Sequence, residues 1–174
     1  MQRNSEFIVD RLTIFDLINR FCMYADWKEW DALRELLANS IWIDYSSFDG
    51  SQPERVDTRI LISSWRELVG GFEAVQHLVT NHCIDVHSRT RATCRAHLHV
   101  HHTLPTRSGG SSWVLGGTYT FGLERLGKGW KISRIVLQTL WSEGNQNLFN
   151  LAFVRAQEVA EREPTRGDLE PMTE

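Results

Sequence analysis

The feature that most restricts the fold is a change in hydrophobic period at His82. From this residue on, apolar side chains recur at every second position, which is typical of antiparallel strands with one buried face. In 90–103, Ala92 to Val100 and then His102 share the apolar face, whereas the intervening residues are polar. We expect strands over 82–87, 90–103, 113–123 and 130–141, and a hairpin loop at PTRSGGSS after Leu104.

The preceding segments are mostly helical in pattern. Apolar residues at three- and four-residue spacing predict helices over 5–25, 30–37, 58–69 and 72–79, and 41–46 alternates as a strand. A closing helix is predicted over 147–162. Helices followed by a run of antiparallel strands indicate an α+β fold, with the helices on one face of a curved sheet. Such a sheet forms a cone whose open end is a natural ligand cavity.

Length and composition limit the class of protein. The 174 residues fit a single domain, which we place over 1–163, followed by a loose, charged tail over 164–174. The net charge of -3 argues against a nucleic-acid partner, and no apolar run is long enough to suggest a membrane span. The N-terminus lacks the apolar core of a signal peptide, so we expect a cytoplasmic protein.

Asp26 permits two interpretations. It follows Ile18 by eight residues and Cys22 by four, which places its carboxylate at the end of the apolar stripe of the first helix, facing the interior. A carboxylate in apolar surroundings is costly to keep and often functional. Alternatively, Asp26 and Glu29 have the spacing of a capping box and would begin the next helix.

Tyr45 ends the apolar row of the 41–46 strand. Its phenol lies either at the edge of a pocket or in ordinary packing with the hydroxyl in water.

Histidines supply the remaining chemistry. Among His97, His99 and His101, neighbours could share a metal ion, but the first and last are about 13 Å apart along a strand. These three residues would otherwise face solvent or a subunit contact. We therefore expect no metal and no cofactor.

Metal-free acid–base chemistry is the alternative. His102 is on the apolar face of its strand, although a bulge would bring His101 there instead. A carboxylate at hydrogen-bond distance fixes the tautomer of an imidazole, so Asp26 could pair with His102. His77 could be a second proton-transfer group, and Tyr45 could donate to a developing oxyanion.

Two segments resemble a known family. The segment DWKEWDALR from Asp26, and especially IDYSSF at Ile43 to Phe48, resemble scytalone dehydratases, which belong to the SnoaL-like, NTF2-like superfamily. The resemblance covers roughly residues 8 to 145. It implies an NTF2-like cone, a homo-oligomer that is a trimer or dimer, and a cofactor-independent dehydratase. Asp26, His77, His102 and Tyr45 would be catalytic, with Asp26 supporting His102.

Departures from the family indicate a different substrate. The family's second water-holding tyrosine matches Ala25, while a substrate-contacting serine and asparagine match Gly117 and Tyr119. The expected substrate is therefore a small molecule of the cyclic or polyketide-like hydroxyketone class. We expect it to contact Tyr24, Phe48, Trp113 and Tyr119. The alternatives are a polyketide cyclase or isomerase and a non-catalytic ligand-binding protein of the same fold.

Overall fold

The computed structural model describes residues 2–106, 110–127 and 129–162. The expected tail over 164–174 and the centre of the 104–112 loop lie outside the described residues. The elements, in chain order, are α1 (Gln2–Trp27), α2 (Trp30–Glu35), β1 (Leu37–Asp44), α3 (Ser46–Asp49), β2 (Glu54–Asp57), α4 (Thr58–Val69), β3 (Ala74–Val86), β4 (Arg91–Thr103), β5 (Ser112–Leu126), β6 (Gly129–Gly144) and α5 (Leu148–Arg162).

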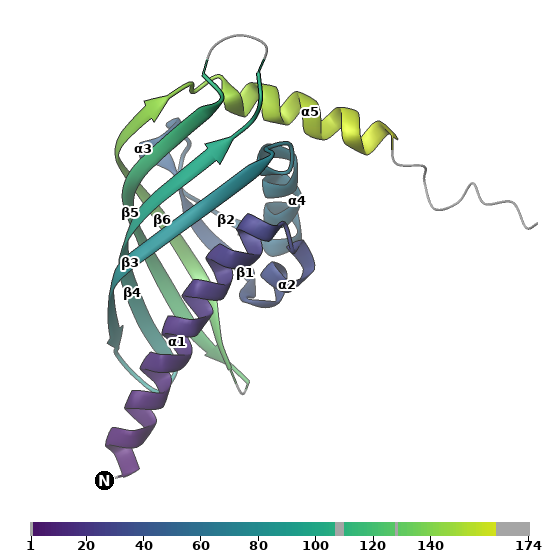
Figure 1. Cartoon of the computed structure of the whole chain (residues 1–174). Helices are drawn as coiled ribbons and strands as arrows, with labels where there is room; N and C mark the ends of the chain where they lie inside the picture. Colours follow the sequence, from purple (N-terminus) through teal and green to yellow (C-terminus); the bar gives the residue numbers. More distant parts are fainter. Residues whose placement is uncertain (1, 107–109, 128, 163–174) are drawn as a thin grey trace, which may run out of the picture.

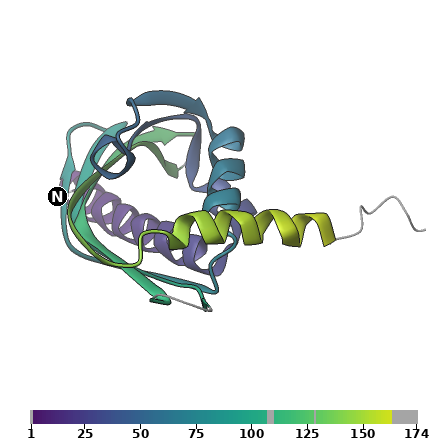
Figure 2. The same cartoon turned by 90° about the horizontal axis from the view of Figure 1, so that it is seen from above.

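A single curved sheet dominates the α+β fold (Figure 1). Its strand order is β2-β1-β6-β5-β4-β3, so the four long strands from β3 to β6 form an antiparallel meander. β1 pairs in parallel with β6, which makes the sheet mixed. Figure 2 shows the sheet wrapping around α1, with α4 closing the open side and α5 crossing the upper end. The expected cone is confirmed.

The core fills the concave side of the sheet. α1 contributes residues at three- and four-residue spacing, as the sequence predicts, and the central strands β4 and β5 contribute every second residue. The residues of α1 in this core are Ile14, Leu17, Ile18, Phe21 and Cys22. None of the described helices is long and apolar enough to cross a membrane.

The end of α1 is held by Lys28. This residue has a φ of 59°, in the left-handed region that usually favours glycine. The backbone N–H of Glu29 donates to the carbonyl of Tyr24 at 2.9 Å, which closes the last turn. The Lys28 ammonium donates to the carbonyl oxygens of Gly70 and Phe72 at 2.9 and 2.6 Å. Lys28 therefore ties the end of α1 to the turn that precedes β3.

The main difference from the sequence prediction lies at 72–86. The expected helix over 72–79 and the expected strand over 82–87 form one strand, β3, of 13 residues. Val75, His77 and Val79 are two residues apart, a spacing that also fits a strand, and β3 pairs along nearly all of β4. A register shift between Thr80 and Cys83, with Asn81 at a φ of 58°, divides the two halves of the pattern.

Candidate active site

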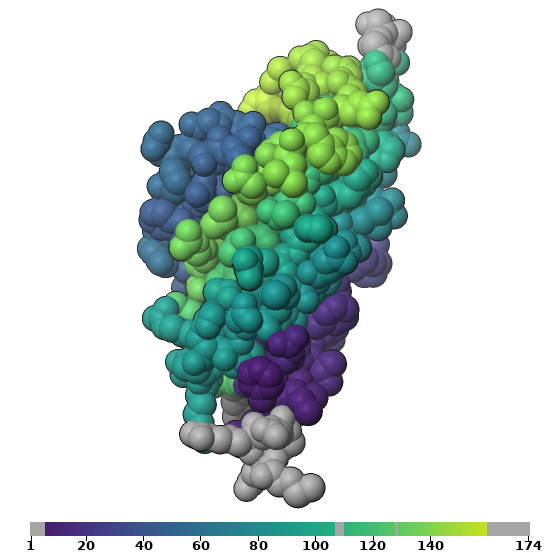
Figure 3. Space-filling view, turned by 90° about the vertical axis from the view of Figure 1, so that its left-hand side faces the viewer, coloured from purple at the N-terminus to yellow at the C-terminus, as the bar shows by residue number. Residues whose placement is uncertain are grey.

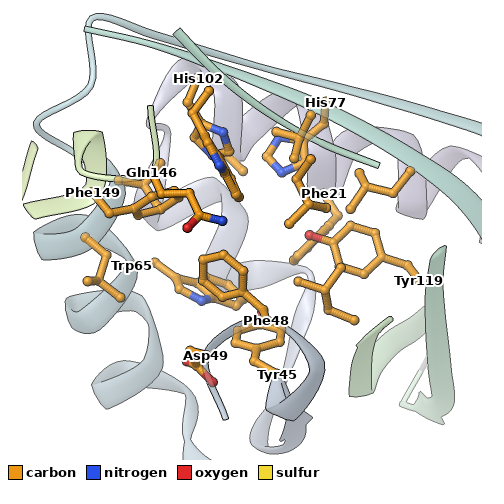
Figure 4. A pocket seen from close by; sticks show the side chains of 18 of the residues that line it. Phe21, Tyr45, Phe48, Asp49, Trp65, His77, His102, Tyr119, Gln146 and Phe149 are labelled. Carbon is orange, nitrogen blue, oxygen red and sulfur yellow. The ribbon is translucent and has the colours of Figure 1, made fainter. Parts of the chain in front are cut away.

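The site is an apolar cavity of about 470 Å³ between the concave face of the sheet and the helices α1, α4 and α5. Its walls are largely aromatic, with a few polar groups among them (Figure 4). This combination of an apolar cavity with few polar groups is typical of small-molecule sites. The lining residues used below are Tyr45, Phe48, Asp49, His77, His102, Trp113, Tyr119, Gln146 and Phe149.

Asp26 and His77 form a buried pair in the cavity wall. The Nδ1–H of His77 donates to Asp26 Oδ1 at 2.6 Å, and the backbone N–H of His77 donates to Asp26 Oδ2 at 2.9 Å. The side chains are only 10% and 13% exposed for Asp26 and His77, respectively. Because the carboxylate accepts the proton of Nδ1, it leaves the Nε2 lone pair of His77 free to accept a proton.

Two sequence interpretations of Asp26 are wrong. Asp26 lies inside α1 rather than capping α2, whose N-cap is Glu29 without a side-chain hydrogen bond. Its partner is His77 and not His102. The physical reason is the position of α1, which packs against β3, the edge strand that carries His77. β4, with His102, is one strand further from the helix.

His102 lies on the cavity face, as the strand pattern predicts, and is 5% exposed. His101, the alternative, points to the other face and does not line the cavity. Rings of Phe72, Trp113 and Phe149 surround His102, with centroids 4.9 to 5.3 Å away. Its Nδ1 is buried without a hydrogen-bond partner among the described residues.

The surroundings keep His102 neutral. Burial lowers its pKa to about 3, with a further decrease from His77. The register explains the second effect: His77 is opposite Val100, so the two histidines are diagonal neighbours on adjacent strands. A group with this pKa is almost entirely unprotonated at neutral pH. The ring therefore acts as a neutral hydrogen-bonding group rather than as a cationic acid.

Two phenols reach the same cavity. Tyr45 comes from the turn after β1, and Tyr119 comes from β5 (Figure 4). Burial raises the pKa of both hydroxyls above the ordinary tyrosine value. Both phenols therefore remain protonated hydrogen-bond donors over the whole range in which a histidine could work as a base.

The remaining predicted contacts divide into two groups. Phe48 and Trp113 line the cavity, and their ring centroids are 5.8 Å apart. Tyr24 is not among the lining residues; it is half-buried against the core. Sequence reasoning missed Phe149 and Gln146, which enter from α5 and the turn before it. The helical pattern predicts α5 but not where it docks.

The other histidines of β4 lie on the outer face of the sheet. His97 and His99 are exposed, and His99 contacts Trp141 with ring centroids 5.7 Å apart. Within the described ranges, no three His, Cys, Asp or Glu residues are grouped in a way that could hold a metal ion. The expectation of a metal-free site remains a prediction.

Fold and site together define a cone-shaped protein of the NTF2-like superfamily, with a His–Asp pair in an apolar cavity. The chain belongs to the SnoaL-like domain family, which matches residues 6–136. No curated protein matches the sequence.

Solved structures with the same fold include several of bacterial origin. The Kfla4162 protein of Kribbella flavida is 30% identical, with a TM-score of 0.75 over 78% of this chain and 93% of that chain. A proposed scytalone dehydratase from Novosphingobium aromaticivorans is 17% identical, with a TM-score of 0.72 over 82% and 92%. The hexachlorocyclohexane dehydrochlorinase LinA, type 2, is 14% identical, with a TM-score of 0.67 over 82% and 93%. The last two likenesses concern the fold alone.

Proposed function

We propose that the protein is a cofactor-independent lyase that removes water from a cyclic or polyketide-like hydroxyketone. The observation that carries this proposal is the Asp26–His77 pair, buried in the wall of an apolar cavity with Nδ1 of the imidazole bound to the carboxylate. General-base catalysis needs an imidazole whose tautomer is fixed and whose charged form is stabilised, and the Asp26 carboxylate can supply both to His77.

The proposed reaction uses one base. Nε2 of His77 takes a proton from the carbon next to the substrate carbonyl, and the electron pair of the C–H bond moves to the carbonyl as an enolate. Asp26 stabilises the imidazolium that forms. The carbonyl then reforms as the C=C bond is made and the C–O bond to the β-hydroxyl breaks. The leaving hydroxyl takes the proton from His77, so water forms and His77 returns to its neutral state.

The other polar groups of the cavity complete this scheme. Tyr45 and Tyr119 are protonated donors that can stabilise the enolate oxygen. Neutral His102 lines the same cavity and can polarise the departing hydroxyl as an uncharged ring. Burial lowers the pKa of His102 too far for a cationic acid, so the structure favours His77 as the only group that changes charge.

The test is turnover of a panel of β-hydroxyketones built on one or two rings. Loss of water creates a conjugated enone, which absorbs in the near ultraviolet, and mass spectrometry measures the loss of one water directly. We expect His77→Gln to reduce turnover by about 10²-fold or more, because general-base catalysis is lost. Exposed His99→Gln is the matched control and should retain activity. Equal rates in the two variants would remove His77 from the mechanism.

An isomerase or cyclase is the second candidate, because it would use the same base and the same phenols. The neutral state of His102 favours an isomerase or cyclase, because isomerisation needs no acid at a leaving hydroxyl. The same assay separates the two, since an isomerised product keeps the mass of the substrate.

We also propose that the protein forms a homo-oligomer through the outer face of its sheet. Figure 3 looks onto this face, where β3 to β6 lie at the surface. It carries exposed Leu78, Leu140 and Trp141, which are 51%, 66% and 49% exposed. Light scattering should give a multiple of the 20.1 kDa chain mass. Leu140→Lys with Trp141→Lys should shift the protein to the monomer.

A further inference from the structure

β1 ends where its parallel neighbour β6 continues. The last residue of β1, Asp44, is paired with Val136, and the chain then turns into α3 at Ser46. In a parallel pair, a residue bonds through its N–H and C=O to the two residues that flank its partner. If β1 continued in the same register, Ser46 would lie opposite Gln138. The turn into α3 therefore removes the strand partner of the β6 backbone around Gln138.

The Ser47 hydroxyl takes the place of the missing strand residue. Its Oγ donates to the C=O of Leu137 at 2.7 Å and accepts from the N–H of Thr139 at 2.9 Å. Leu137 and Thr139 are the two residues that flank Gln138. One hydroxyl thus makes both hydrogen bonds that a residue of β1 would have made, and the two backbone groups of β6 are paired.

The backbone of Ser46 does not compete for these positions. Its N–H donates to Asp44 Oδ1 at 3.2 Å, and its C=O accepts from the N–H of Gly50 at 3.0 Å. Both bonds are local and close the single turn of α3. A helical turn of four residues is not stable through its own hydrogen bonds, so the position of α3 against the sheet depends on links such as that of Ser47 to β6.

The residues on both sides of Ser47 enter the cavity. Tyr45 and Phe48 line it and come from this one short segment (Figure 4). The centroid of the Phe48 ring is 5.5 Å from that of Phe149 and 5.8 Å from that of Trp113. A displacement of α3 would therefore move a phenol and part of the aromatic wall together.

We propose that Ser47 is a positioning residue, whose hydroxyl continues the β1–β6 ladder and so holds the Tyr45 phenol and the Phe48 ring in the cavity. The role of Tyr45 at an enolate oxygen rests on the proposed function, whereas the link of α3 to β6 and its effect on ligand binding do not. Ser47 is outside the cavity lining, so it acts through these two neighbours and not on a ligand directly.

The first measurement is the backbone amide exchange rate of Thr139 by nuclear magnetic resonance. Ser47→Thr keeps the hydroxyl, and Ser47→Val has the same shape without it, so the two variants differ only in the hydrogen bonds. We expect the Thr139 amide to exchange about tenfold faster in the valine variant, because it loses its acceptor. The amide of Ile132, bound to the C=O of Leu36, should exchange equally in both. Equal rates at Thr139 would overturn the proposal.

The second measurement is the affinity for 1-tetralone, a ketone with two fused rings, by isothermal titration calorimetry. We expect Ser47→Val to bind it at least fivefold more weakly than Ser47→Thr. In a background that carries Tyr45→Phe and Phe48→Ala, the same comparison should differ by less than twofold, because the groups that Ser47 positions are gone. An undiminished difference would contradict positioning. Ser46→Ala is the matched control, since this hydroxyl donates to Asp44 and its loss should leave the affinity unchanged.

Positioning and turnover fail separately in these experiments. If Ser47→Val weakens ketone binding through Tyr45 and Phe48 but the parent protein dehydrates no hydroxyketone, Ser47 keeps its role and the lyase proposal fails. If the parent protein is a dehydratase but Ser47→Val binds the ketone as tightly as Ser47→Thr, Ser47 does not position the site.

Discussion

Asp26 contacts His77 with both carboxylate oxygens, one on the ring Nδ1 at 2.6 Å and one on the backbone N–H at 2.9 Å. The backbone contact positions the carboxylate independently of the imidazole. The ring contact then fixes the orientation and tautomer of His77, with Nε2 directed away from Asp26. An edge strand and a helix are thus joined at the point where the proposed proton transfer takes place.

The first prediction concerns Asp26→Asn. The amide can still accept from the His77 backbone, but its NH₂ group can donate to Nδ1 and so place the ring proton on Nε2, the wrong nitrogen for a base. We expect turnover to fall by about 10²-fold or more with the fold retained. Circular dichroism checks the fold. Asp16→Asn on the exposed side of α1 is the control, and similar losses in both variants would contradict a specific role for Asp26.

The second prediction concerns acid stability. His102 has a folded-state pKa of about 3, below the unfolded value of about 6.5, so the unfolded chain binds a proton between these values and the folded chain does not. Stability is therefore lost as pH falls through this window, and about 2 kcal/mol should disappear by pH 5 from this group. His102→Phe should remove that part of the loss. Urea unfolding at pH 7 and pH 5 measures the difference in unfolding free energy for both proteins. The same pH dependence in His102→Phe as in the parent protein would count against a neutral, buried His102.

The sequence was sufficient for the α+β fold class because most of its local patterns agree with one another. The period-two run after His82 predicts the meander, and the helical repeats before it predict α1 and α4, the latter with its observed bounds. The strand pattern also placed His102 on the cavity face. Such inferences depend only on which side of an element a residue occupies.

Contacts between elements that are distant in the sequence could not be predicted from these local patterns. Whether Asp26 meets His77 or His102 depends on which strand lies against α1, and sequence spacing does not contain that information. The short apolar segment 72–79 fits a helix or a strand, and its pairing with β4 decides the outcome. Phe149 reaches the cavity only because the turn at 145–147 directs α5 across the open end, a relationship between distant segments.

The third prediction concerns Lys28. Replacement by methionine keeps the unfavourable positive φ and removes two charge-assisted hydrogen bonds, which should cost about 1.5–3 kcal/mol. Lys28→Gly also loses the bonds but relieves the backbone, so it should be more stable than the methionine variant by about 1 kcal/mol. Chemical denaturation measures the free energy of unfolding of the parent protein and of the two variants. If methionine matches the parent protein, the lysine does not join α1 to the turn before β3.

The last prediction concerns the closure of the cavity by α5. Gly71 lies against the backbone of α5, where an added β-carbon would overlap the carbonyl oxygen of Ala152. Backbone cannot yield as a flexible side chain would, so Gly71→Ala should push α5 outward and carry Phe149 away from Trp113 and His102. Overpacking of this kind costs about 1–3 kcal/mol.

Effects on the ligand site distinguish the expected displacement of α5 in Gly71→Ala from a general loss of stability. At a temperature where the variant is folded, it should bind the neutral ketone 1-tetralone more weakly. Trypsin should also cut faster at Arg155, because α5 no longer packs against Gly71. Gly129→Ala is the control, since nothing lies within 4 Å of the added carbon. Were Gly71→Ala to bind the ketone as tightly as the parent protein, Phe149 would not form part of the ligand site. The aromatic wall would then consist only of residues from the first 144 positions.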